Sequence, residues 1–238
     1  MSRRRIGAIV RKEIRTYRRT GSIVWAMAVV PLVFIIQPLI SVFSLSSEAA
    51  HQLSHHHELL YMLSIPALVP VLLASYAVVG ERQDGTLEPV LTTPISREEL
   101  VLGKALAVFV PSIVIAYLVF GAFLLVVALF AHPGVAPAII RGPDVLVQVI
   151  FTPLVAGWSI WLGIAISTRV NDVRVAQQLS VLASLPTIAL ITLLSLSVIH
   201  PSAQLAILFG VVLLIGNRLG WRLVSSLFDR ERLIASVR

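Results

Sequence analysis

The chain has 238 residues, of which 57% are hydrophobic and 13% charged, with a net charge of +7 and no cysteine. A soluble domain would carry about 25% charged residues, and the lack of cysteine excludes disulfides, thiolate metal sites and cysteine nucleophiles. The apolar runs are continuous and far longer than the ~10-residue alternating strands of an outer-membrane barrel, so they predict an all-α polytopic membrane protein.

Residues 1–21 are predicted to form a cytoplasmic amphipathic helix that lies in the membrane interface. Ile6, Ile9, Val10, Ile14 and Tyr17 recur at helical spacing, and Arg and Lys fill the other faces. The apolar run that follows is longer than the roughly 7–15-residue core of a signal peptide and has no A-x-A site after it. We therefore interpret this run as a retained first span.

Six apolar runs are long enough to cross a hydrocarbon core about 30 Å thick. They cover residues 22–43, 59–79, 101–131, 145–167, 175–199 and 203–217. The last is the weakest, because about 15 residues at ~1.5 Å rise give only about 22 Å, so Arg218 and Arg222 would have to reach the interface. The expected division is a six-helix transmembrane domain over residues 22–220 and a cytoplasmic C-terminal tail over residues 221–238.

The loop between the first two spans contains a cluster of histidines. If this segment is helical, His51, His55 and Glu58 share one face, at a spacing that suits Zn²⁺, Cu²⁺ or Ni²⁺. The alternative is a solvated loop without a ligand. A zincin motif is excluded, because Tyr61 stands where the second histidine of H-E-x-x-H would be.

The segment GERQDGTLEPVLTTPISREELVLGK, residues 80–104, carries eight charged side chains between two apolar spans. Gly85 suits the left-handed position after a helix end, and Thr86 can cap a short helix that begins at Leu87. Ser96 and Glu99 have the spacing of a capping box at the start of the third span. The loop over residues 80–100 is thus predicted to hold a short transverse helix between two capped helix ends.

The basic residues give the orientation of the chain. With six spans, 18 of the 19 Lys and Arg residues lie on the side of the termini and of residues 80–104, and only Arg141 lies on the other. By the positive-inside rule, both termini and this loop are cytoplasmic in a multi-pass protein of the cell membrane. Topology and attraction to the lipid bilayer explain the net positive charge, so no nucleic-acid partner is expected.

Residues 80–104 resemble the signature of the type-2 permease family of ATP-binding cassette transporters. The resemblance rests on an acidic residue, a Gly-Thr-Leu-Glu core, a Thr-Pro turn and a Ser-Arg-x-Glu-Leu start of the third span. It implies that the loop contains a coupling helix that docks into a cleft of a separate ATPase subunit. The residues assigned to this coupling site are Glu81, Asp84, Gly85, Thr86, Leu87, Glu88, Thr93, Pro94, Ser96 and Arg97.

The resemblance further implies a permease subunit of an exporter that pairs with a second protomer; a homodimer is expected ahead of a heterodimer, and the sequence does not decide between them. ATP and Mg would bind in the partner subunit, and this chain would bind no cofactor. The sequence agrees, because it has no G-x-x-x-x-G-K-[ST] phosphate loop. It also has no ionisable residue deep in a predicted span, as an ion-coupled carrier would need.

Transport has two alternatives from other classes of function. A membrane enzyme would need a histidine or an acid at membrane depth to activate a Ser or Thr, and the predicted spans contain neither, so the chain is not expected to be an enzyme. A non-transporting anchor or sensor that docks another cytoplasmic protein stays open as the alternative. The sequence identifies neither the substrate nor the residues that bind it.

Overall fold

The computed structural model describes residues 2–44, 57–85, 95–132 and 135–227, and all regular elements within these ranges are helices. The helices are α1 (Arg3–Arg19), α2 (Gly21–Phe43), α4 (Glu58–Tyr61), α5 (Ser64–Gln83), α7 (Arg97–Phe130), α8 (Val135–Ile139), α9 (Gly142–Ser167), α10 (Val173–Ser195) and α11 (Ala203–Leu227).

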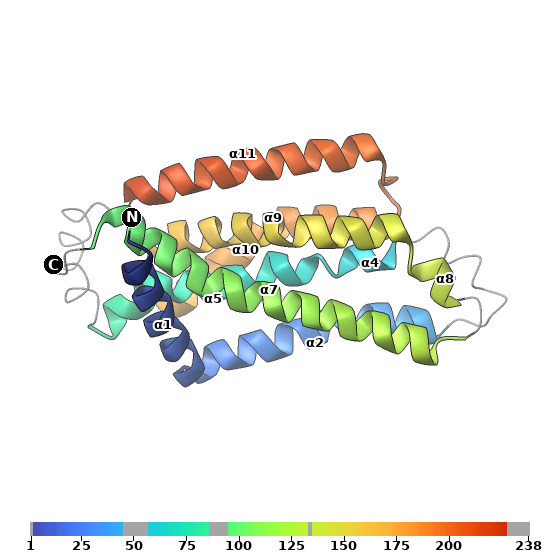
Figure 1. Ribbon diagram of the computed structural model, residues 1–238, viewed down its shortest axis with the longest axis horizontal. Coiled ribbons are helices and arrows are strands. Elements are labelled where there is room, and N and C mark those ends of the chain that lie inside the picture. Colours follow the sequence, from blue (N-terminus) through green and yellow to red (C-terminus); the bar gives the residue numbers. More distant parts are fainter. Residues whose placement is uncertain (1, 45–56, 86–94, 133–134, 228–238) are drawn as a thin grey trace.

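Six helical segments are long and apolar enough to cross a membrane, which confirms the predicted six spans and the all-α class. They are α2, the α4–α5 pair, α7, α9, α10 and α11. The six run along the length of the bundle, and α1 lies across one end of it (Figure 1). We name this end the α1 end, and the opposite end, where α4 and α8 lie, the α4 end. The last turn of α11 returns to the α1 end, so the first and last helices finish on the same side.

Helix α5 is the centre of the bundle. In its most apolar stretch 83% of the residues are buried, against 6% in α11. Ala67, Ala74 and Ala77 on α5 are buried almost completely, and such small side chains let neighbouring helices approach closely in a membrane. A displacement of the end of α5 would therefore reach α2, α7, α9 and α10, against which this helix packs.

The expected end of the sixth span is wrong. Helix α11 continues past Asn217 to Leu227, so it has 25 residues and is long enough to cross. Asn217 does not mark a boundary, because its amide is satisfied inside the bundle: its Oδ1 accepts from Trp161 Nε1 at 3.1 Å and its Nδ2 donates to the Leu154 carbonyl at 3.0 Å. The fifth span also differs, since α10 ends at Ser195 and Ser197 then takes a left-handed φ of 56°.

Candidate coupling site at the α1 end

The two helices that flank residues 86–94 end and begin as the sequence predicts. Asp84 follows the last turn of α5, and its carboxylate accepts a hydrogen bond from Tyr76 Oη at 3.0 Å. Gly85 has a φ of +66°, which confirms its left-handed role and which a residue with a Cβ adopts only at a cost. The chain therefore turns away from α5 at a fixed point.

The start of α7 has the predicted capping box. Ser96 Oγ accepts from the Glu99 N–H at 3.3 Å, and Glu99 Oε2 accepts from the Ser96 N–H at 3.2 Å. Glu99 has a second function, because its Oε1 accepts from the Ser2 N–H at 2.6 Å and its Oε2 lies 3.6 Å from Arg5 Nη1. The carboxylate that caps α7 thus also fixes the first turn of α1.

A buried cluster of charges joins α1, α5 and α7 just inside these ends. Lys104 of α7 is fully buried, and Glu13 of α1 and Glu81 of α5 are 3% and 6% exposed. The Lys104 ammonium lies 2.9 Å from Glu13 Oε1, 2.7 Å from Glu81 Oε2 and 2.6 Å from the Ala77 carbonyl oxygen. The contacts with Glu13 and the Ala77 carbonyl are hydrogen bonds, and the contact with Glu81 is an ion pair.

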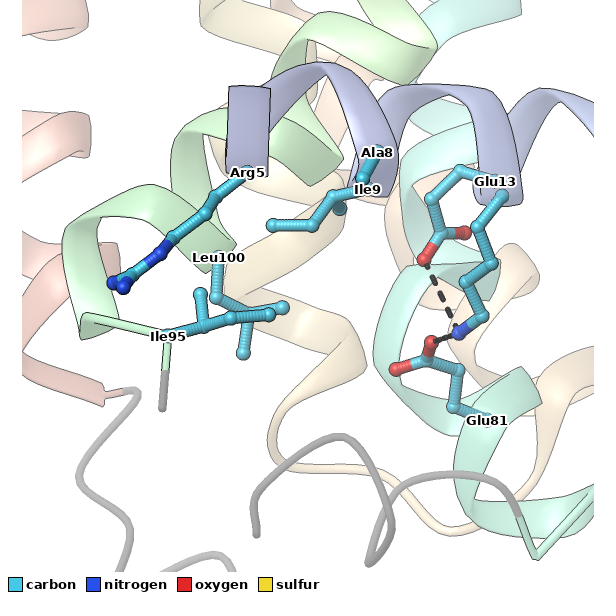
Figure 2. Close-up of a pocket in the computed structure, with 8 residues that line it drawn as sticks. Arg5, Ala8, Ile9, Glu13, Glu81, Ile95 and Leu100 are labelled. Carbon is cyan, nitrogen blue, oxygen red and sulfur yellow. Dashed lines mark hydrogen bonds and ion pairs between the residues drawn. The ribbon is translucent and has the colours of Figure 1, made fainter. Parts of the chain in front are cut away.

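Lys12 lies on the solvent-facing side of this cluster. Its ammonium pairs with Glu81 and lies 3.8 Å from Glu13, and its side chain is 43% exposed. Figure 2 shows Glu13 and Glu81 facing each other from α1 and α5, beside a pocket of about 260 Å³. The same view places Leu100 of α7, and Ile95 just before that helix, across this pocket from Ile9. The α1 end is thus hollowed beside the point where the flanking helices meet.

Helix α1 packs against α7 at close range. A Cβ on Gly103 would lie 2.7 Å from Ile9 Cγ2, so glycine is what permits the approach. Tyr17 is also buried there, and burial together with the negative charges of Glu13 and Glu81 raises the pKa of its phenol well above the usual range. The face of α1 that contacts the bundle is therefore apolar at both ends, with one acid between them.

The end of α5 is held on its other side by the connection between α9 and α10. Arg82 Nη1 donates to the Val170 carbonyl at 3.1 Å and to Asn171 Oδ1 at 2.6 Å. Ser167 Oγ, at the end of α9, accepts from the N–H groups of Val78 and Val79, each at 3.0 Å. The last turn of α5 is consequently fixed between α1, α7 and α9.

The remaining predicted site residues divide into two groups. Thr86, Leu87, Glu88, Thr93 and Pro94 lie outside the described residues, so the predicted transverse helix stays a prediction, while Arg97 begins α7 with an exposed side chain.

The proposed metal ligands His51 and His55 are likewise outside the described residues. The third ligand, Glu58, is buried at the start of α4, where Gln37 Nε2 lies 3.5 Å from its Oε2. The part of the chain that the structure describes contains no group of three acidic or histidine side chains placed to hold a metal ion.

Sequence reasoning missed Lys12 and Glu13 and saw Lys104 only as part of the loop pattern. A usable signal was present, since Glu13 lies four residues after Ile9 and four before Tyr17, on the apolar face of α1. A lone acid on such a face needs a buried cation as its partner. The sequence does not say which cation that is.

Six membrane-crossing helices in one bundle define a multi-pass membrane protein, whose α1 end carries the charged cluster. The sequence model of the family described as ABC-2 family transporter protein matches residues 9–176, which include the whole cluster and both flanks of the loop. The chain belongs to this family and is the membrane-embedded permease subunit of an ATP-binding cassette transporter, a class that works with an ATP-binding cassette partner and is generally non-catalytic. The search of curated proteins gave no match.

Proposed function

We propose that this permease subunit exports its substrate, using ATP and Mg bound in a separate ATPase subunit that docks on the loop between α5 and α7. The observation that carries the proposal is the buried charge cluster of Glu13, Glu81 and Lys104. It joins three helices at the two points where the chain leaves the bundle and returns to it. A force applied to the loop is therefore applied to α1, α5 and α7 together.

The energetics favour movement of the three helices as one unit. Separating a buried ion pair leaves charges without compensation, at a cost of about 3–5 kcal/mol. The Lys104 ammonium faces two carboxylates and a carbonyl, so sliding α7 past α1 or α5 would incur such a cost. A rigid-body tilt keeps these contacts. In this proposal the docked ATPase produces a tilt of the unit, which opens the pathway toward the outside.

We further infer the orientation of the chain in the membrane and its assembly with a second copy. The loop and both termini face the cytoplasm, where ATP is present, and this chain itself binds no nucleotide and catalyses no reaction. A second copy of the chain supplies the other half of the pathway. Helices α2 and α10 support this, because only 17% and 22% of their most apolar stretches are buried within one protomer, which leaves faces for a partner or lipid.

Single cysteines test docking and orientation together, because the chain has no native cysteine. Gln83→Cys and Glu98→Cys place thiols at exposed positions on the two flanks of the loop, and His200→Cys places one at the exposed α4 end. The permease is expressed in membranes with and without a Walker-motif ATPase encoded beside it. Labelling by a membrane-impermeant maleimide is then measured in inside-out and right-side-out vesicles.

We expect the two flank cysteines to react only in inside-out vesicles and to be protected when the ATPase is present. The His200→Cys variant should react only in right-side-out vesicles and be indifferent to the ATPase. Reaction of the flank cysteines from the outside would overturn the orientation. Unchanged labelling in a complex that co-purifies with the ATPase would overturn docking at this loop.

A further inference from the structure

A second cavity lies at the α4 end, far from the coupling site. It has a volume of about 440 Å³, within the range of about 300–1,000 Å³ usual for small-molecule sites. Its walls come from the α4–α5 junction, α9, α10 and α11, and are almost entirely apolar. Representative wall residues are Leu60, Leu63, Phe151, Ile191, Ala206 and Phe209.

One wall of this cavity is a pair of stacked aromatic rings. Phe151 of α9 and Phe209 of α11 have centroids 5.5 Å apart and planes inclined by 5°. Ala206, one turn before Phe209, has only a methyl group, so space remains in front of the rings. The wall is therefore firm and wide enough to receive a hydrocarbon group.

The polar part of the cavity is an acid–histidine pair. His57 Nδ1 lies 2.9 Å and 3.0 Å from the two carboxylate oxygens of Asp144. The side chains are 20% and 8% exposed, and both line the cavity. Glu58, next to His57 in the chain, and Arg141, three residues before Asp144, are not among the lining residues, so Asp144 is the acid that a ligand would meet.

We propose that this cavity binds an amphiphilic amine, with its ammonium group paired to Asp144 beside His57 and its apolar part against Phe151 and Phe209. When the imidazole is neutral, the pair carries one negative charge, and the apolar surroundings strengthen its attraction for a cation. An anionic head would meet the carboxylate and be repelled. A neutral head would gain only a hydrogen bond, so charge selects the amine.

This inference goes beyond the proposed function and does not depend on it. Binding in the cavity requires neither ATP nor the ATPase subunit, because the site lies within one protomer at the end remote from the loop. Failure of the coupling experiments would leave it untouched.

The test uses the full chain in lipid nanodiscs and three photoreactive probes of one chain length: a diazirine dodecylamine, dodecanol and dodecanoate. Labelled residues are mapped by mass spectrometry, with unlabelled dodecylamine as competitor. We expect the amine to label cavity residues such as Leu60 and Ile191 and to be displaced by the competitor. Dodecanol should label them weakly and dodecanoate not at all.

Two variants separate the charge from the space. Asp144→Asn keeps the shape of the side chain and should lower amine affinity at least about tenfold, to the level of dodecanol. Ala206→Trp fills the cavity and should abolish labelling there by both probes. The control, Leu208→Trp, places the same indole side chain at an exposed α11 position outside the cavity and should change nothing.

Equal labelling by amine and dodecanol would overturn the proposal, since the cavity would then accept any hydrocarbon chain, including that of a membrane lipid. Cavity labelling that survives Ala206→Trp would also overturn it, because the probe would be reacting from the surface. Thermal unfolding of each variant without probe is measured beside these experiments. Labelling is then compared only between variants that unfold at the same temperature as the original chain.

Discussion

The two ends of the bundle both bury charged side chains, but they surround them differently. At the α1 end, the Lys104 ammonium meets two carboxylates and a carbonyl and is fully buried. At the α4 end, Asp144 has His57 as its partner and borders a cavity of about 440 Å³. The first arrangement resists any relative movement of its helices, whereas the second leaves room for a guest. A tightly paired charge cluster and an open cavity thus lie at opposite ends of the bundle.

The largest expected effect contrasts the two buried charges directly. Lys104→Met leaves the buried carboxylates of Glu13 and Glu81 without their buried cation, and should destabilise the protein by about 3–5 kcal/mol. Asp144→Asn leaves a neutral amide that still accepts from His57, so it should cost only about 1 kcal/mol. Reversible unfolding in mixed lipid–detergent micelles measures both. Equal losses would show that the two ends do not differ as described.

Removing the three buried charges of Glu13, Glu81 and Lys104 together tests whether the cluster at the α1 end serves stability or coupling. Adding Glu13→Gln and Glu81→Gln to Lys104→Met removes the uncompensated carboxylates, so most of the lost stability should return. Stimulation of the partner ATPase should stay low in this triple variant, because the helices are no longer joined by ion pairs. A triple variant that recovers both properties would assign the cluster to folding alone.

The next effect concerns the turn after α5. Gly85→Ala forces a residue with a Cβ into a φ of +66°, which costs about 1–2 kcal/mol even though no atom lies within 4 Å of the new methyl. Gly121→Ala in α7 is the control, since it meets equally open space in a helical backbone and should gain about 0.5–1 kcal/mol. Thermal unfolding separates the two. A loss in both variants would point to crowding rather than backbone conformation.

Caps at the two ends provide a smaller comparison. Ser96 caps α7 at the α1 end, and Ser202 Oγ accepts from the Leu205 N–H at 3.2 Å at the start of α11. Replacement of either by Ala should cost about 1 kcal/mol. Only Ser96→Ala should also weaken stimulation of the ATPase. Weakening by Ser202→Ala to the same extent would remove the distinction between the ends.

The smallest effect appears at alkaline pH. Burial near two carboxylates raises the pKa of Tyr17 in the folded protein above its unfolded value. The stability associated with the neutral phenol is present below the unfolded pKa and declines as pH rises above about 10. Tyr17→Phe cannot ionise, so its unfolding free energy should fall less steeply from pH 9 to 11 than that of the original chain. Parallel profiles would mean that Tyr17 is not buried beside these acids.

Local features of this protein were readable from the sequence, and distant pairings were not. The Ser96–Glu99 capping box and the turn at Gly85 depend on residues within one helical turn of each other, so the spacing of these residues predicts both structures. The contact between Lys104 and Glu13 spans 91 positions, and only the packing of α1 across the bundle brings it about. The pairing of His57 with Asp144 spans 87 positions, and it likewise depends on how distant helices pack, here α4 and α9.

The error at Asn217 has a related cause. The predicted sixth span is the apolar run over residues 203–217, which ends at Asn217. The helix continues because Trp161 and Leu154 of α9 satisfy the amide. Hydropathy scores the polarity of a side chain but contains no information about the hydrogen-bond partners that satisfy it in the fold.

The position of Lys104 in the chain also has a consequence for biogenesis. A ribosome makes Glu13 and Glu81 before it makes Lys104, so both acids of the cluster exist before the base that neutralises them. Until α7 emerges, the two carboxylates of the cluster have Lys12 beside them but not Lys104. Lys104 completes the cluster, so the contacts that hold the start of α7 against α1 and α5 can form only after α7 has been made.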